Sequence, residues 1–244
     1  MKLDVLAFGA HPDDVELGCS GVLLVEKANE KKVGVVDLTQ GELGTRGTAA
    51  IRKKEATKAA EILNLDVRIN LAMADAFFVN DEAHQRKIIE VLRQYCPEII
   101  LINAPEDRHP DHGRGCALLN DAAFFSGLSK IETFDKDGNL QNPWRPKYVF
   151  SYIQDRYLKP DFVVDISDVM DKKIESIRAY STQFFNPDAK GETETYISTP
   201  EFLDGVIARA AMFGKMIGVK YAEGFISKKA IGLSNLDGLI LKNT

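Results

Sequence analysis

Short apolar runs recur along the chain, and polar and apolar residues alternate with a helical period between most of them. The runs predict strands near residues 3–9, 33–38, 67–71, 98–103, 148–153 and 161–166. The helical segments between them imply parallel pairing through right-handed crossovers, with helices on both faces. We therefore expect an α/β fold, a Rossmann-like three-layer sandwich with a mostly parallel central sheet. The loops after the first four strands should gather at one edge of it.

The last third of the chain has a different pattern. Residues 168–180 predict a helix, and residues 181–195 are polar and loop-like. Thr199 and Pro200 predict the start of another helix, with Thr199 as N-cap and proline at the first helical position. This helix, 201–219, carries more apolar surface than the edge of a small sheet needs, so we expect a homo-oligomer.

Length and composition agree with a single compact domain over residues 1–244, since 45% of the residues are hydrophobic. The net charge of −5 argues against nucleic acid and against an anionic membrane as partners, and favours a small-molecule substrate. No apolar stretch has the length of a membrane span, and no signal peptide is recognisable. The three cysteines have no paired spacing, which predicts a cytoplasmic protein without structural disulfides. Cys19 and Cys116 are expected to pack in the core rather than bind metal.

The segment from Phe8 to Glu16 combines a buried strand end with a helix start and contains His11, Asp13 and Asp14. Ligands bind at the carboxyl ends of strands in open α/β sheets. Acidic residues also occur in first turns as helix caps, and capping is the alternative interpretation here. Capping does not account for the histidine beside them.

A second polar cluster, Glu106 to His112, follows the apolar run that ends at Ile102. The two clusters together hold three of the four histidines in the chain. His11, Asp14 and one histidine of the second cluster would supply two imidazoles and a carboxylate, with a coordination position left for water, as in catalytic zinc sites. The same ligand set also occurs in iron(II) oxygenases, usually on β-barrels.

The chemistry of such a site needs a base as well as an ion. Zinc supplies Lewis acidity and lowers the pKa of its water toward ~7, and a nearby base must then take a proton. Asp13 is the candidate base, because His11 and Asp14 can converge on one ion while Asp13 points elsewhere. In the second cluster, His112 can ligate while His109 reaches the substrate as an acid or oxyanion donor. For His109, the alternative is a loop histidine that hydrogen-bonds a neighbouring carboxylate.

These segments resemble the LmbE-like, PIG-L-type deacetylase family, which pairs an (A)HPDD segment near the amino terminus with an HPDH-type segment in mid-chain. Residues 10–14 and 109–112 match both segments. Residues 39–47, 70–75 and 221–225 further resemble the branch that deacetylates N-acetylglucosaminyl-malate in bacillithiol synthesis. The resemblance implies removal of acetyl from an N-acetylglucosamine conjugate, most of all N-acetyl-α-D-glucosaminyl L-malate. Another glucosamine conjugate, a non-haem iron enzyme and a cofactor-free carbohydrate-binding module are the alternatives.

The resemblance also implies roles for individual residues. The ligands of Zn2+, with Fe2+ as the other candidate metal, would be His11, Asp14 and His112. Asp13 would be the base, and His109 would assist as electrophile or acid.

Three further residues are candidates for substrate binding. By the resemblance, Arg52 and Asp75 occupy positions similar to those that contact the sugar. Arg52 is alternatively part of an ordinary charged helix face with Glu55, and Asp75 alternatively caps a turn. Tyr196 ends the loop before the last helix, so it either closes over the pocket as part of a lid or lies on a plain surface loop.

Two other features each have two interpretations. The glycines at 41, 44 and 47 lack the spacing of a dinucleotide fingerprint. We expect their segment to be a flexible loop over the metal site, with a plain connecting loop as the alternative. Glu223 is interpreted as a turn residue that ties down the tail, with contact to a neighbouring pocket as the alternative.

Overall fold

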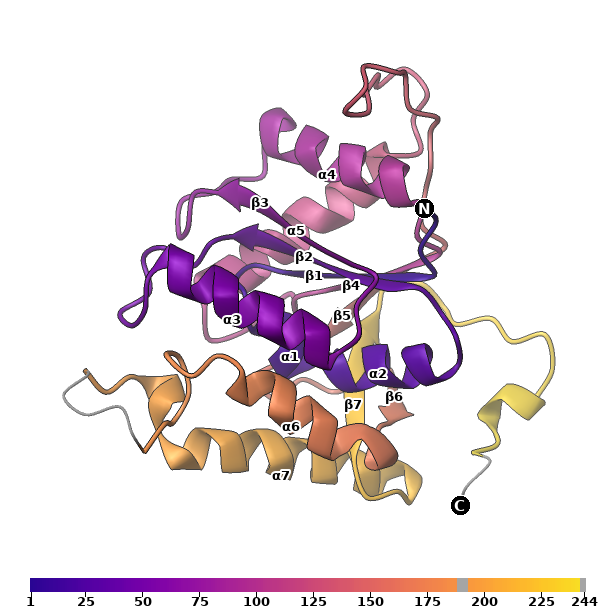
Figure 1. Ribbon diagram of the computed structural model, residues 1–244. Coiled ribbons are helices and arrows are strands. Elements are labelled where there is room, and N and C mark those ends of the chain that lie inside the picture. Colours follow the sequence, from indigo (N-terminus) through magenta and orange to yellow (C-terminus); the bar gives the residue numbers. More distant parts are fainter. Residues whose placement is uncertain (188–192, 242–244) are drawn as a thin grey trace.

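The computed structural model describes residues 1–187 and 193–241, which build a seven-stranded sheet in the order β3-β2-β1-β4-β5-β7-β6 (Figure 1). The strands are β1 Val5–Gly9, β2 Val33–Thr39, β3 Val67–Met73, β4 Ile99–Ile102, β5 Tyr148–Tyr152, β6 Phe162–Asp165 and β7 Ala222–Ser227. Strands β1 to β5 pair in parallel, and β7 lies antiparallel between β5 and β6. The expected mostly parallel sheet is confirmed.

Helices cover both faces of the sheet. They are α1 Asp14–Gly18, α2 Ser20–Ala28, α3 Ala49–Ile62, α4 Glu82–Tyr95, α5 Pro110–Phe125, α6 Met170–Arg178 and α7 Pro200–Ile217, with short 3-10 turns η1 Ser167–Val169, η2 Tyr196–Ser198 and η3 Asp237–Leu239. Figure 1 shows α4 and α5 on one side and α1, α2, α3 and α6 on the other, where α7 also lies beside β7. Over the described residues, none of these helices is both long and apolar enough to cross a bilayer.

The alternation of side chains along β1 explains the three layers. Leu6 and Phe8 point into a core shared with α4 and α5, whereas Val5 and Ala7 point into a core shared with α1 and α2. Successive strand residues face opposite sides of a sheet, so a strand buried on both sides is apolar throughout. This pattern is why β1 was predictable as a continuous apolar run.

Strand β7 was not predicted. The segment was interpreted as a tail with Glu223 at a turn, whereas residues 222–227 form a strand whose Glu223 is buried. Glutamate and glycine both have a low propensity for strands, so no signal for β7 was present in the sequence. The turn interpretation of Glu223 is therefore wrong.

The helical segment that follows β1 is broken into α1 and α2 at Cys19. The break brings Gly18 so close to β5 that a Cβ there would lie 2.2 Å from the ring of Tyr152. It also leaves backbone groups of both helices without their usual partners. Lys173 donates to the carbonyls of Glu16 and Leu17, so a side chain from α6 satisfies part of this need.

Candidate active site

The loops that follow β1 to β5 open onto a pocket of about 330 Å³. Its lining includes all eight residues that the sequence singled out: His11, Asp13, Asp14, Arg52, Asp75, His109, His112 and Tyr196. The expectation that the first four of these loops meet at one edge of the sheet is confirmed. Residues 43–46 also line the pocket, as expected for a loop over the site.

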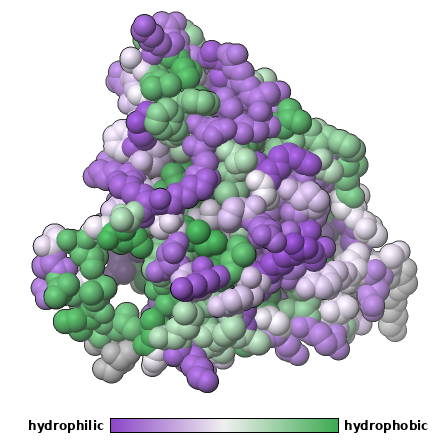
Figure 2. Space-filling model, turned by 180° about the vertical axis from the view of Figure 1, so that it is seen from behind, coloured by the Kyte–Doolittle hydropathy of each residue, from purple (hydrophilic) through white to green (hydrophobic). Residues whose placement is uncertain are grey.

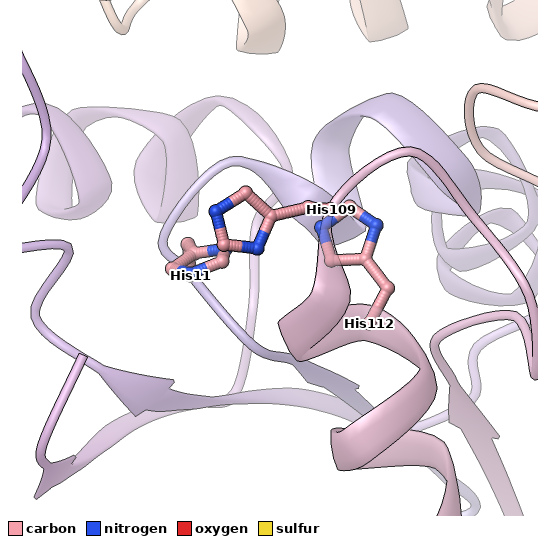
Figure 3. Close-up of side chains that lie close together, drawn as sticks. All are labelled: His11, His109 and His112. Atoms are coloured by element: carbon pink, nitrogen blue, oxygen red, sulfur yellow. The ribbon is translucent and has the colours of Figure 1, made fainter. Parts of the chain in front are cut away.

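Three imidazoles form the centre of this pocket (Figure 3). The ring of His11 lies 4.6 Å from that of His109 and 5.8 Å from that of His112, measured between centroids. One ring nitrogen from each histidine can be chosen so that the three atoms lie within 4.8 Å of one another. Residues from two loops about a hundred positions apart thus converge on one point.

Asp14 lies between two of the imidazoles. Its Oδ1 is 3.1 Å from Nε2 of His112, and its Oδ2 is 3.6 Å from Nδ1 of His11. The side-chain amides of Asn103 and Gln154 also donate to this carboxylate, at 3.1 and 2.8 Å. Burial alone would raise the pKa of Asp14, but the charge of His112 and hydrogen bonds from both histidines lower it well below its usual range.

Second carboxylates orient both histidines. Nδ1 of His112 is 2.7 Å from Oδ2 of Asp107, which leaves Nε2 toward the pocket. Nε2 of His11 is 3.1 Å from Asp75 and 3.2 Å from Asp111, which leaves Nδ1 toward Asp14. Burial opposes protonation of His112, yet the negative charge of Asp14 and the hydrogen bond to Asp107 raise its pKa to about 9 in the absence of metal.

This donor set fits a divalent metal ion. Two imidazole nitrogens face one buried carboxylate, and each imidazole has a carboxylate on its other nitrogen, an arrangement typical of metal-ligating histidines. A closely packed group of buried carboxylates and imidazoles is costly unless a cation balances it. The set of His11, Asp14 and His112 suits zinc and also suits iron(II).

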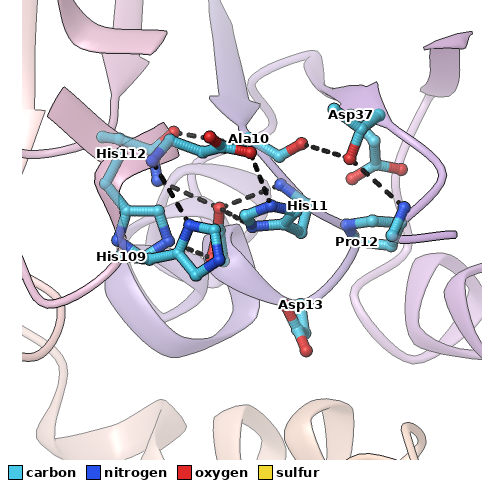
Figure 4. A network of polar contacts seen from close by, with 12 residues as sticks. Ala10, His11, Pro12, Asp13, Asp37, His109 and His112 are labelled. Carbon is cyan, nitrogen blue, oxygen red and sulfur yellow. Dashed lines mark hydrogen bonds and ion pairs between the residues drawn. The ribbon is translucent and has the colours of Figure 1, made fainter. Parts of the chain in front are cut away.

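Asp13 lies apart from the network that joins the histidines (Figure 4). Its backbone has a φ of 122°, which is strained for a residue other than glycine. Its side chain makes no capping hydrogen bond within the described residues, so the interpretation of Asp13 as a simple helix cap is wrong. Burial raises the pKa of Asp13 to about 7 although the charge of Arg52 lowers it.

Arg52 is 4% exposed and donates to Oδ2 of Asp13 at 2.9 Å. It also donates to the carbonyl of Pro12. The alternative of an exposed helix face paired with Glu55 is therefore wrong, since Glu55 instead accepts from Thr182. Gly41 has a φ of 63°, and a Cβ there would lie 2.6 Å from the Arg52 guanidinium, so this glycine makes room for the arginine.

His109 is the N-cap of α5, and its Nδ1 accepts a hydrogen bond from the backbone of Asp111 at 3.2 Å. The neutral ring therefore carries its proton on Nε2, where it can donate to a ligand. Burial lowers the pKa of His109, and the charges of His11 and His112 lower it further. The alternative in which His109 only hydrogen-bonds a carboxylate does not hold.

The other two predicted substrate residues differ in their surroundings. Asp75 is buried and accepts from the backbone of Leu43 at 2.9 Å in addition to its contact with His11. The Tyr196 hydroxyl donates to Asp155 at 3.1 Å, and its side chain is exposed on the pocket wall. The predicted lid of residues 181–197 lies partly outside the described residues, because 188–192 are not among them.

Sequence reasoning missed the residues that position the candidate ligands. Asp107 and Asp111 are part of the second polar cluster, and their spacing from His112 was the available signal. Asn103 and Gln154 follow the ends of β4 and β5, and only the sheet order brings them to Asp14.

The chain is similar to several known proteins. A family model described as GlcNAc-PI de-N-acetylase, PIG-L, matches residues 6–124. Diacetylchitobiose deacetylase of Thermococcus kodakarensis is 30% identical over 233 residues, covering 90% of this chain and 81% of that protein. A probable N-acetyl-alpha-D-glucosaminyl L-malate deacetylase 2 of Bacillus subtilis is 26% identical, and the match covers 75% of this chain and 84% of that protein. The crystal structure of the conserved protein TT1542 from Thermus thermophilus is 32% identical with a TM-score of 0.82, covering 95% and 98% of the two chains.

Proposed function

The chain belongs to the PIG-L family of de-N-acetylases, and on that premise we propose that it is a metal-dependent hydrolase that deacetylates an N-acetylglucosamine conjugate. One observation carries the proposal: a buried, strained Asp13 shares a pocket with a histidine and carboxylate set that fits a metal ion. A protein that only bound carbohydrate would not need a carboxylate held in this way. Strain at such a position is typical of functional sites.

The residues divide the reaction between them. A metal ion held by His11, Asp14 and His112 would polarise the amide carbonyl and make water more acidic. Asp13 accepts a proton from the attacking water, and a pKa of about 7 makes its carboxylate an effective base near neutral pH. Arg52 keeps this carboxylate in place.

His109 acts on the carbonyl oxygen of the amide. Its Nε2–H donates to the carbonyl oxygen as negative charge develops there. The new bond joins the water oxygen to the acetyl carbon, the C–N bond breaks, and the amine of the sugar takes a proton. Acetate is the second product.

For the substrate, we propose N-acetyl-α-D-glucosaminyl L-malate, the conjugate used in bacillithiol synthesis. The similarity to the Bacillus subtilis protein supports this choice, as do the three matching segments outside the metal motifs. The similarity to a diacetylchitobiose deacetylase makes that disaccharide the competing substrate.

A direct assay tests reaction, metal and substrate together. The purified protein, with its metal content measured, is incubated with the malate conjugate, diacetylchitobiose and free N-acetylglucosamine, and the free amine is quantified. We expect the malate conjugate to be preferred. Removal of the metal by a chelator should reduce the rate at least about 100-fold, with recovery on adding Zn2+ or Fe2+. Amine release that needs oxygen would favour the iron oxygenase alternative, and no release from any amide would refute the proposal.

We also propose that the chain forms a homo-oligomer through its carboxyl-terminal segment, residues 229–241. Figure 2 shows this segment at the lower left, where it projects from the rest of the molecule and carries hydrophobic residues. Leu236, Leu239 and Ile240 are 75, 66 and 68% exposed, which is unfavourable in water unless another surface covers them. A second copy presents the same segment, as a symmetric interface requires.

Truncation tests this interface. Removing residues 229–244 leaves β7 complete. We expect light scattering to give a mass of several times 27.1 kDa for the whole chain, and the truncation should reduce the number of chains per particle. Replacing Leu236 and Leu239 by Ser should do the same, whereas replacing the exposed Leu140 by Ser should not. An unchanged mass for both tail variants would exclude the segment as the interface.

A further inference from the structure

A second pocket, of about 790 Å³, adjoins the candidate active site. Asp155, Thr195, Tyr196 and Phe202 line both pockets, so the two share a wall. Tyr196 is held in this wall by its hydrogen bond to Asp155 and by the Arg108 guanidinium, which lies 4.5 Å from the centre of its ring. A ligand bound at the histidines and longer than one sugar can therefore extend past Tyr196 into the second pocket.

Arg209 of α7 lines this second pocket. It is partly buried, and over residues 1–187 and 193–241 it has no hydrogen-bond or ion-pair partner. Five other arginines in those ranges that are at least partly buried have such partners: Arg52, Arg68, Arg86, Arg93 and Arg114. Arg209 differs from all five.

The carboxylates whose charges act on Arg209 already have partners of their own. Asp155 accepts from Arg108 and Tyr196, Asp107 accepts from the backbone of Arg108 and Arg156, and Glu223 accepts from Lys173. Burial lowers the pKa of Arg209, although the guanidinium remains charged at neutral pH. A partly desolvated cation without a partner is unfavourable, and an anion that reaches it gains a charge-assisted hydrogen bond.

We propose that the second pocket is the subsite for the group attached to the sugar, and that Arg209 binds a carboxylate or phosphate on that group. The proposal rests on the proposed function and adds to it the subsite and the residue that bind the anionic group of the substrate. Tyr157, Val206 and Met212 supply apolar wall beside Arg209, which suits a short carbon skeleton carrying the anion. Glu194 and Glu201 are at the pocket but exposed, so water and salt screen their charges.

The test compares substrates that differ in charge. Values of kcat/KM are measured for N-acetylglucosaminyl-malate, N-acetylglucosamine 1-phosphate and the neutral methyl glycoside, with the wild type and Arg209→Gln. We expect the ratio of the anionic to the neutral value to fall at least about tenfold in the variant, through KM rather than kcat. The two anionic substrates show whether a carboxylate or a phosphate benefits more.

Two further variants make the result interpretable. Arg209→Lys keeps the charge and should restore part of the ratio, whereas Arg178→Gln removes an exposed arginine of α6 and should leave it unchanged. A ratio within about twofold of the wild type in Arg209→Gln would overturn the proposal. If the wild type deacetylates nothing, the proposed function fails instead. In that case, calorimetry measures the affinity of the wild type and of Arg209→Gln for glucosaminyl-malate. Equal affinities would show that Arg209 does not bind the anionic group.

Discussion

Replacing Asp13 by Asn should lower kcat for deacetylation by about 10²- to 10⁴-fold, the usual contribution of a general base. The variant keeps the shape of the side chain and removes its ability to take a proton. Asn tolerates positive φ better than most residues, so the strained backbone at 122° can be retained. The loss should therefore appear in turnover rather than in folding.

Metal content separates this result from damage to the site. Asp13 is turned away from the histidines, so Asp13→Asn should bind as much metal as the wild type. Asp14→Asn should lose metal, because Asp14 lies between His11 and His112. The exposed Asp137→Asn serves as the matched control. Turnover of Asp13→Asn within about tenfold of the wild type would exclude Asp13 as the base.

The parallel part of the fold could be predicted because its signals are local. Strands buried on both faces leave continuous apolar runs, and the polar clusters that follow β1 and β4 mark their carboxyl ends. Parallel strands place those ends at one edge, so the meeting of His11 with His109 and His112 follows from topology. Partners that depend on the order of distant strands were not accessible in this way.

Arg52 illustrates the limit most clearly. In the sequence it stands among lysines on a helix, where an exposed charged face is the ordinary interpretation. Only the position of α3 against the β1 loop brings it to Asp13. Similarly, Asn103 and Gln154 are unremarkable polar residues until β4 and β5 are placed beside β1.

The break between α1 and α2 depends on another long-range contact, the buried pair of Lys173 and Glu223. Their charged atoms are 2.6 Å apart, and both side chains are about 95% or more buried. Glu223 also accepts from the backbone of Gly21 and Val22 at 2.9 and 2.7 Å, while Lys173 donates to two carbonyls of α1. The pair thus satisfies backbone groups on both sides of the break. Because α1 begins with Asp14, the same contact helps to hold the active-site loop.

Replacing Glu223 by Ala should reduce the free energy of unfolding by about 3–5 kcal/mol, because the buried ammonium of Lys173 loses its counter-ion and two backbone donors lose their acceptor. For a chain of this length the melting temperature should fall by about 10 °C, measured by calorimetry with metal present.

The control is Glu201→Ala, at an exposed position of α7, which should change the melting temperature little. The double replacement Lys173→Met with Glu223→Met should be more stable than Glu223→Ala, since it removes the unpaired charge and fills the volume. If Glu223→Ala has the same melting temperature as the wild type, the pair does not stabilise the break, and apolar packing such as that of Gly18 on Tyr152 holds it instead.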